Sequence, residues 1–412
     1  MDLPNISIDK QRLWDSLMAM ARVGATARGG NCRLALSDLD REGRDLFVRW
    51  CKEAGMAVSV DRMGNIFARR EGRDPTLPPI VTGSHLDTQP HGGRFDGVYG
   101  VLAGLEVVRT LNDRGFETDA PIEVAVWTNE EGSRFAPAMI ASGVFAGVFT
   151  EDYAHSRADT EGKTIGQELA RIGYLGETKC GGRRLGALFE AHIEQGPILE
   201  AEQRTIGVVT GAQGQRWFDV AVTGQDSHAG TTPMNRRRDA LLGAARLVDR
   251  VNAIALAHAP LAVGTVGVIA AEPGSRNTVA GGARLTVDLR HPDDDALSAM
   301  AAALHAASAA IGAELGLGFE VKEIWYSKPV RFDRDCVAAV RSAAKACGFE
   351  AMDIVSGAGH DACYISRVAP TGMIFVPCAD GISHNEIESA TPDDLAAGCN
   401  VLLRAMLSRA VA

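Results

Sequence analysis

The chain has 412 residues, 46% of them hydrophobic, and a formal net charge of −10 at pH 7. This length exceeds what one ordinary hydrophobic core accommodates, so we expect two packed domains. The acidic balance excludes a nucleic-acid groove or a face that binds an anionic membrane, because both require clustered Lys and Arg.

Eight cysteines are scattered along the chain, and no two have the C-x-x-C spacing of a zinc ribbon or redox site. They are typical of small buried hydrophobes in a reducing compartment. The first residues lack the basic and apolar regions of a signal peptide. The most apolar long stretch, residues 296–318, contains His305 and Glu314, which favours a helix of a soluble protein over a membrane span. We therefore expect a cytoplasmic protein.

Hydrophobic periodicity predicts alternating helices and strands in the first half of the chain. The predicted helices cover residues 9–22, 37–54 and 98–112, and the strands cover 57–60, 65–69, 80–85, 122–127 and 188–193. Several of these strands end in polar residues. This pattern predicts an α/β sheet whose functional site lies beyond the strand ends.

The pattern changes near residue 213 and changes back near residue 325. The intervening stretch predicts strands at 216–223, 264–270 and 283–290 and helices at 239–258 and 293–312, which together suit a separate α+β sandwich. Helices at 334–347 and 392–408 and strands at 352–356 and 372–377 then resume the first pattern. We predict one domain from residues 1–212 and 325–412, with residues 213–324 inserted as a second.

Imidazole and carboxylate groups lie beside glycine-bearing loops or at predicted strand ends, where hydrolytic metal sites recruit their ligands. The candidates are His85, Asp96, Glu130, Glu131, His192 and His384. Any one of them alone is weak evidence, because a single His is more often an ordinary core or surface residue. Asp87 lies two residues after His85, on the same side of an extended strand. It can accept the imidazole N–H and fix the ring, or it can simply cap a turn.

Five motifs together resemble the hydantoinase/carbamoylase branch of the M20 metallopeptidase superfamily. They are GSHLDT at 83–88, GGRFDG at 92–97, NEEGSRF at 129–135, HIEQGP at 192–197 and SHNE at 383–386. Aminopeptidase-type relatives typically place a carboxylate where this chain has His192. The resemblance covers nearly the whole chain, and it is closest to β-ureidopropionases and N-carbamoyl-L-amino-acid hydrolases.

The resemblance implies a two-metal centre. In it, His85 and His192 bind one ion, Glu131 and His384 bind the other, and Asp96 bridges them. Glu130 is then left as the general base. Zinc is the expected metal, with manganese, cobalt and nickel as alternatives that oxygen and nitrogen ligands also accept.

The resemblance also implies residues that hold the substrate. His228 follows a predicted strand and is expected to reach the site of a partner subunit and stabilise an oxyanion, which implies a homodimer. Asn277 and Arg290 match a clamp for a substrate carboxylate. The alternatives without a functional role are that His228 is a histidine of a surface loop and that Arg290 forms a surface ion pair.

Two further pieces are expected near the site. Gln195 follows the strand that carries His192 and can bind the ureido NH2 group or serve as a buried structural amide. In the loop after strand 352–356, Gly357 and Gly359 are expected to line the pocket, with His360 behind the metal ligands.

The function implied is hydrolysis of the ureido C–N bond of linear N-carbamoyl amino acids, either N-carbamoyl-L-amino acids or N-carbamoyl-β-alanine. The first alternative is allantoate amidohydrolase. A dipeptidase or aminoacylase, or a relative that binds without catalysis, is a weaker alternative. The inserted domain is expected to act as a lid and a dimerisation domain.

Overall fold

The computed structural model describes residues 6–411, and its backbone contacts divide them into two compact units. The first unit runs up to Thr210 and resumes at Phe332, and the second is Gly211–Arg331. The chain therefore leaves the first unit once and returns to it once, as an inserted unit requires.

The first sheet has nine strands within the described residues. Their bounds are β1 Ala57–Val60, β2 Ile66–Arg70, β3 Ile80–His85, β4 Ile122–Trp127, β5 Ala187–Ile193, β6 Ile206–Ala212, β14 Val330–Arg331, β15 Ala351–Ser356 and β16 Thr371–Val376. The order is β1-β2-β4-β3-β5-β16-β6-β14, and β15 pairs with β6. The four central neighbours β4, β3, β5 and β16 are parallel, whereas β1, β2, β6 and β14 pair antiparallel. The predicted α/β class, with a mixed sheet, is confirmed.

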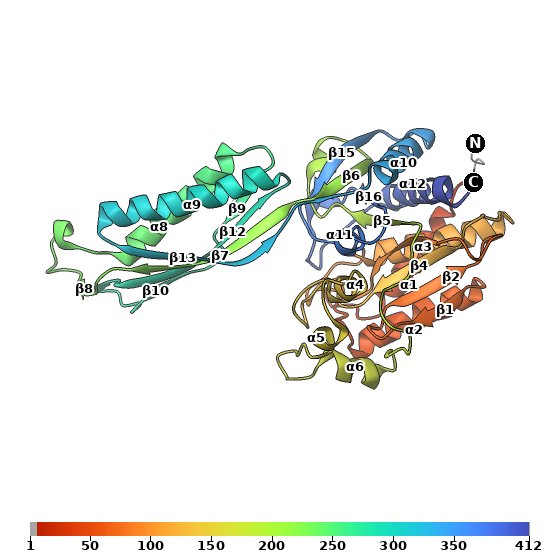
Figure 1. The fold of residues 1–412 in the computed structure, drawn as a ribbon, viewed down its shortest axis with the longest axis horizontal. Helices are drawn as coiled ribbons and strands as arrows, with labels where there is room; N and C mark the ends of the chain where they lie inside the picture. The colour runs from red at the N-terminus through yellow and green to blue at the C-terminus, as the bar shows by residue number, and fades with distance from the viewer. Residues whose placement is uncertain (1–5, 412) are drawn as a thin grey trace. The chain divides into compact units, whose positions relative to one another are not determined.

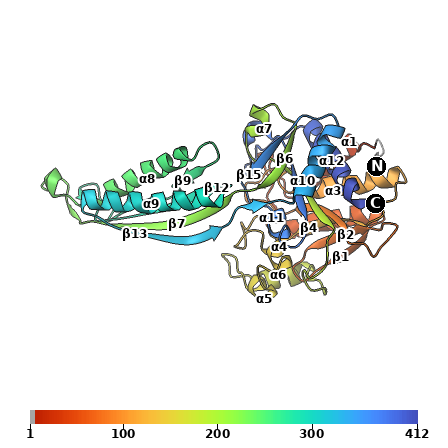
Figure 2. The ribbon, with the colours of Figure 1, turned by 45° about the horizontal axis from the view of Figure 1, so that its top comes forward.

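Helices of the first unit pack around this sheet. They are α1 Lys10–Ala21, α2 Asp38–Glu53, α3 Val98–Asp113, α4 Ile140–Phe145, α5 Glu151–His155, α6 Ile165–Ile172, α7 Ile198–Ala201, α10 Arg334–Ala346, α11 Asp361–Ile365 and α12 Pro392–Ala410, with a 3-10 turn η2 at Ala379–Gly381. Helix α12 lies beside α10 and α3 (Figure 2). It also packs on strands β5 and β16. Gly100 lets α3 approach the sheet, since a Cβ there would lie 2.4 Å from the Ala191 carbonyl oxygen.

The second unit is a sheet with two helices on one face. Its elements are β7 Gly214–Thr223, β8 Ser227–His228, η1 Met234–Arg236, α8 Ala240–Ala257, β9 Val263–Thr265, β10 Ile269–Glu272, β11 Thr278–Val279, β12 Gly282–His291, α9 Asp294–Leu315 and β13 Gly318–Ser327. The sheet order is β10-β12-β7-β13, with β9 also on β12, and β8 pairs separately with β11. Helices α8 and α9 lie side by side along the sheet (Figure 1) and bury residues such as Leu247 and Leu304 against it.

Two expectations for the second unit need correction. The single strand predicted at 264–270 is two short strands, β9 and β10, on the same edge of β12. Thr265 pairs with Asp288, and Ile269 pairs with Leu285. The four residue steps from Thr265 to Ile269 therefore run beside only three steps on β12, and the extra residue forms a β-bulge. The boundary predicted after residue 324 falls inside β13, a strand that hydrophobic periodicity did not predict, and the unit continues to Arg331.

Helix α9 is long and apolar enough to cross a membrane by length and composition alone. One of its faces, which includes Leu297, Met300 and Leu304, is buried in the core of the second unit. The apolar residues of this face thus pack against the sheet of their own unit.

Candidate metal centre

The predicted ligands come together at the carboxyl ends of the four central parallel strands. His85 is the last residue of β3, and His192 is the next-to-last residue of β5. Glu130 and Glu131 follow β4, and His384 follows β16. Asp96 lies in the loop between β3 and α3. Ligands of open α/β sheets bind at this edge, so the topology explains the convergence of residues far apart in sequence.

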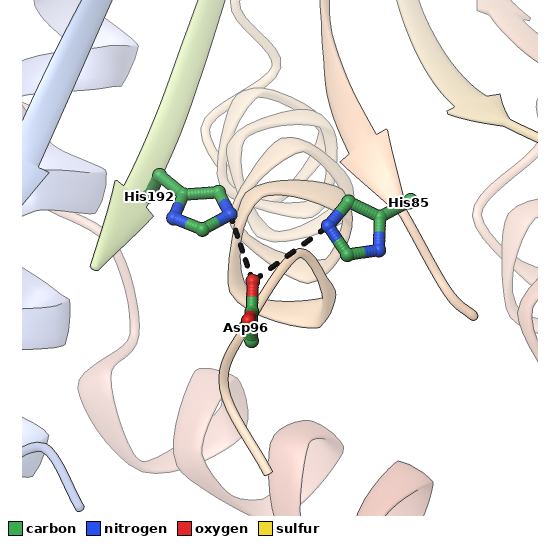
Figure 3. A group of neighbouring side chains, drawn as sticks. All are labelled: His85, Asp96 and His192. Carbon is green, nitrogen blue, oxygen red and sulfur yellow. Dashed lines mark ion pairs between the residues drawn. The ribbon is translucent and has the colours of Figure 1, made fainter. Parts of the chain in front are cut away.

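The Asp96 carboxylate lies between two groups of side chains of the kinds that bind metal ions. Its Oδ1 atom is 3.7 Å from His85 Nε2 and 3.2 Å from His192 Nε2. Figure 3 shows both imidazole rings projecting from their strands towards this carboxylate. The side chains of all three residues are nearly inaccessible to solvent.

The second carboxylate oxygen of Asp96 faces the other group. Its Oδ2 atom is 3.3 Å from His384 Nε2, which is in turn 3.5 Å from Glu131 Oε2. Potential ligand atoms of His85, Asp96 and His192 lie within 4.8 Å of one another, and so do those of Asp96, Glu131 and His384. One carboxylate shared by two such groups is the arrangement that a pair of cations requires.

The outer nitrogens of the two buried histidines are held by backbone carbonyls. The Nδ1 atom of His85 is 2.8 Å from the Asp87 oxygen, and that of His192 is 2.9 Å from the Ile193 oxygen. These contacts place the proton on Nδ1 and leave the Nε2 lone pairs directed at Asp96. The Gly97 N–H also donates to His192 Nε2 at 3.1 Å. Nε2 of His85, Nε2 of His192 and Oδ1 of Asp96 thus face one another. All three atoms can offer a lone pair, and such a set suits a metal ion.

Several backbone conformations at the site are unusual. Asn129, Gln195 and His384 have φ values of 57°, 58° and 53°, a left-handed region that non-glycine residues seldom occupy. Gly97 has φ 67°, and a Cβ there would lie 2.3 Å from the His85 ring. The tight packing of these loops therefore aims the ligand side chains.

Negative charge is concentrated around the ligands. Burial raises the pKa of Glu130 well above its usual range, and the carboxylates of Asp361, Glu131, Asp96 and Asp87 raise it further. Burial, together with Asp40, raises the pKa of Asp87 to about 7. Carboxylates packed this closely are stable in their ionised form only when cations neutralise them. The electrostatics thus fit the divalent metals that the motifs imply.

The expected hydrogen bond from the His85 ring to the Asp87 carboxylate is wrong, because the ring contacts a different atom of Asp87. The ring N–H of His85 is held by the Asp87 backbone oxygen, while the Asp87 carboxylate accepts the N–H groups of Glu130 at 3.4 Å and Glu131 at 3.3 Å. Strand β3 ends at His85, so the alternation of a strand no longer sets the direction of residue 87. Asp87 instead fixes the backbone of the two glutamates.

Gln195 lies against the shared carboxylate. Its Nε2 atom is 2.9 Å from Asp96 Oδ2 and 3.0 Å from Ser383 Oγ, which leaves its amide oxygen as an acceptor. Gly357 is exposed, and a Cβ there would meet nothing within 4 Å, whereas a Cβ on Gly359 would meet the Met139 side chain at 2.8 Å. His360 is buried beside His192, with 4.6 Å between ring centroids, and its Nε2 is 3.0 Å from Ser356 Oγ.

Glu388 is a buried carboxylate at the site that was not predicted from the sequence. Glu388 is 1% exposed and accepts the backbone N–H groups of Phe95 at 2.9 Å and Asp96 at 3.2 Å. Burial, together with Asp96, raises its pKa to about 7. The SHNE motif ends at Glu386, two residues before Glu388. The only sign of Glu388 in the sequence was its acidic side chain four positions after His384.

The remaining predicted residues belong to the second unit. His228 is exposed at the end of β8, and its Nδ1 accepts the Gly230 and Thr231 N–H groups at 3.0 and 3.2 Å. Asn277 lies next to it, since its backbone oxygen accepts the Ala229 N–H at 2.9 Å. Arg290, on β12, donates to the carboxylate of Asp288, with Nη2 2.8 Å from Oδ2. This ion pair is the alternative weighed for Arg290 from the sequence.

Comparison with known proteins decides the family. Residues 81–408 match the model of peptidase family M20/M25/M40. The chain belongs to this family. Its sequence is 52% identical to the N-carbamoyl-L-amino-acid amidohydrolase of Rhizobium meliloti, over 98% of both chains, and 32% identical to the allantoate amidohydrolase of Bacillus subtilis, over 95% of this chain and 96% of that one. The structure of a hydantoinase/carbamoylase family amidase from Burkholderia multivorans matches with a TM-score of 0.97 and 64% identity, covering 99% of this chain and all of that one.

These matches confirm the resemblance inferred from the motifs. The M20 family is typically metal-dependent, and among the described residues of this member are groups of His, Asp and Glu that fit metal ions.

Proposed function

We propose that this M20 family protein is a metal-dependent amidohydrolase that cleaves the ureido C–N bond of linear N-carbamoyl-L-amino acids. The products are the free amino acid and carbamate, which decomposes to carbon dioxide and ammonia. The observation that carries the proposal is the carboxylate of Asp96, whose two oxygens face two separate groups of metal-ligand types. Full-length similarity to the Rhizobium meliloti amidohydrolase supports the substrate class.

The proposed ligands are His85 and His192 for one ion and Glu131 and His384 for the other, with Asp96 shared. When bound, the two divalent ions acidify the water between them and polarise the ureido carbonyl. Zinc is the proposed metal, and manganese, cobalt or nickel would satisfy the same ligand types.

Glu130 is the proposed general base. Its Oε2 atom lies 3.5 Å from His85 Nε2, beside the ligands. It takes a proton from the attacking water and returns it to the leaving amine nitrogen, so that the two transfers cancel over one turnover.

Substrate recognition is proposed to involve both units. The Gln195 amide oxygen accepts from the ureido NH2, since its nitrogen already faces Asp96. Arg290 and Asn277 bind the substrate carboxylate, and Gly357 and Gly359 line the pocket. We further propose a cytoplasmic homodimer in which His228 completes the partner's site and the second unit acts as a lid.

Turnover of a substrate panel tests the function. Metal-loaded protein is assayed with several N-carbamoyl-L-α-amino acids, their D-enantiomers, N-carbamoyl-β-alanine and allantoate, with ammonia release as the readout. We expect the highest kcat/KM with an N-carbamoyl-L-α-amino acid. Exclusive turnover of allantoate would replace the substrate with that of the Bacillus subtilis relative, and the absence of ammonia from every substrate would overturn the hydrolase proposal.

A further inference from the structure

Glu388 joins the loop that carries Asp96 to the loop that carries His384. Besides the Phe95 and Asp96 N–H groups, its carboxylate receives the Ser383 hydroxyl, which lies 3.2 Å from Oε2. Ser383 immediately precedes His384. A single buried carboxylate therefore contacts both loops.

Gly93 is shaped to admit this carboxylate. A Cβ on Gly93 would lie 2.1 Å from Glu388 Cδ and Oε1 and 2.4 Å from Oε2, and these are its three nearest atoms. Gly93 is not among the glycines with positive φ, so its backbone alone does not require glycine. What requires glycine at position 93 is therefore the space that Glu388 fills.

The contacts define how Asp96 is oriented. Glu388 holds its backbone N–H, while Gln195 Nε2 and Ser383 Oγ approach its Oδ2 atom at 2.9 and 3.2 Å. Because Ser383 contacts both Glu388 and Asp96, displacement of Glu388 frees the Asp96 backbone and the residue next to His384 together.

We propose that Glu388 is a positioning residue that sets the spacing between Asp96 and His384 and thereby the affinity of the centre for its metal ions. The inference rests on the proposed ligand set, but it assigns a role to a residue that binds no metal itself. Outer groups that orient ligands typically change metal affinity by about 10–100-fold when removed.

Metal titration of three variants tests this role. Protein freed of metal by a chelator is titrated with Co²⁺ alone, and the visible absorption of the bound ion gives the dissociation constant. Glu388→Ala removes all acceptor atoms, and we expect about 10–100-fold weaker binding. Glu388→Gln keeps one oxygen for the two backbone N–H groups and an NH2 group that can donate to Ser383, so we expect most of the affinity to return.

Glu386→Gln is the matched control. Glu386 lies two residues earlier in the same loop and pairs with Arg28 at 3.5 Å. We expect its Co²⁺ affinity to equal that of the wild type. Circular dichroism and thermal unfolding establish that each variant is folded.

Gly93→Ala provides a second route to the same displacement. We expect it to weaken Co²⁺ binding in the wild type and to add little in the Glu388→Ala background, where the methyl group has room. If Glu388→Ala does not fold, the affinities of Gly93→Ala and Glu388→Gln decide.

Failure of this inference is distinguishable from failure of the proposed function. Unchanged Co²⁺ affinity in folded Glu388→Ala, or in folded Gly93→Ala, would overturn the role of Glu388 and leave the hydrolase intact. A wild type that binds no Co²⁺ would instead overturn the metal centre and the proposed function with it.

Discussion

Glu130 and Glu131 are adjacent in the chain, yet their carboxylates face different partners. Glu130 Oε2 lies 3.5 Å from His85 Nε2, while Glu131 Oε2 lies 3.5 Å from His384 Nε2 and receives Gln89 Nε2 at 2.7 Å. Asp87 holds both backbone N–H groups, which keeps the two side chains apart. This geometry supports separate roles for a base and a ligand.

Replacing each glutamate with glutamine separates the two roles. We expect Glu130→Gln to retain the wild-type metal content and lose at least about 100-fold in kcat, because a proton acceptor is removed. Glu131→Gln serves as the neighbouring comparison, and we expect it to lose bound metal. Metal analysis and steady-state kinetics on both proteins provide the check, and near-normal turnover by Glu130→Gln would exclude it as the base.

The ligand types and their order could be predicted from the motifs, but the contacts of Asp87 and Glu388 could not. Asp87 lies beyond the end of a strand, where side-chain direction depends on the turn that follows. Glu388 depends on a contact with residues almost 300 positions earlier in the chain, at Phe95 and Asp96. Local pattern carries no information about such pairings.

At the scale of elements, helix α2 supports the strand that precedes the two glutamates. Arg44 is fully buried and donates to the Asp40 carboxylate at 2.8 Å, to the Gly64 oxygen at 2.8 Å and to Thr128 Oγ1 at 3.2 Å. Thr128 directly follows β4 and lies two residues before Glu130. The hydrogen bond from Arg44 to Thr128 therefore ties the helix to the start of the loop that carries Glu130 and Glu131.

Arg44→Met should destabilise the protein strongly. The substitution leaves Asp40 buried without its partner, which typically costs about 3–5 kcal/mol. The exposed pair Arg341–Asp353, at 2.8 Å, is the matched control, and Arg341→Met should cost at most about 1 kcal/mol. Urea unfolding of both variants measures the difference, and similar small losses would show that the buried pair contributes little.

Element types and most boundaries of the main helices and strands followed from the hydrophobic pattern. Helices such as α2 bury one face, while central strands such as β4 and β16 are buried along their whole length. The prediction was wrong where tertiary contacts decide. The bulge between β9 and β10 exists only because both strands pair with β12. Strand β13 alternates weakly in burial and lies on the edge of its sheet, so hydrophobic pattern alone did not reveal it.

At the scale of the whole molecule, the residues proposed to act together are divided between two units. The proposed metal ligands belong to the first, while His228, Asn277 and Arg290 belong to the second. A homodimer in which the second unit completes the partner's site is a prediction that activity can test directly.

Mixing two inactive variants tests that prediction. Glu130→Gln lacks the base and His228→Ala lacks the group supplied to the partner. In a mixed dimer, one of the two sites contains both intact residues. After subunit exchange at equal concentrations, we expect about a quarter of wild-type activity to return, because half the dimers are mixed and each has one competent site. Activity that stays at the level of the separate variants would mean that His228 acts within its own subunit or not at all.

The metal content of the wild type and of Asp96→Ala is the most direct test of the account. Plasma mass spectrometry of protein dialysed against trace metal should give about two divalent ions per wild-type chain, as a centre with one shared carboxylate requires. Because both ions depend on Asp96, folded Asp96→Ala should lose both. A wild type without bound metal, or a variant that retains two ions, would contradict the account.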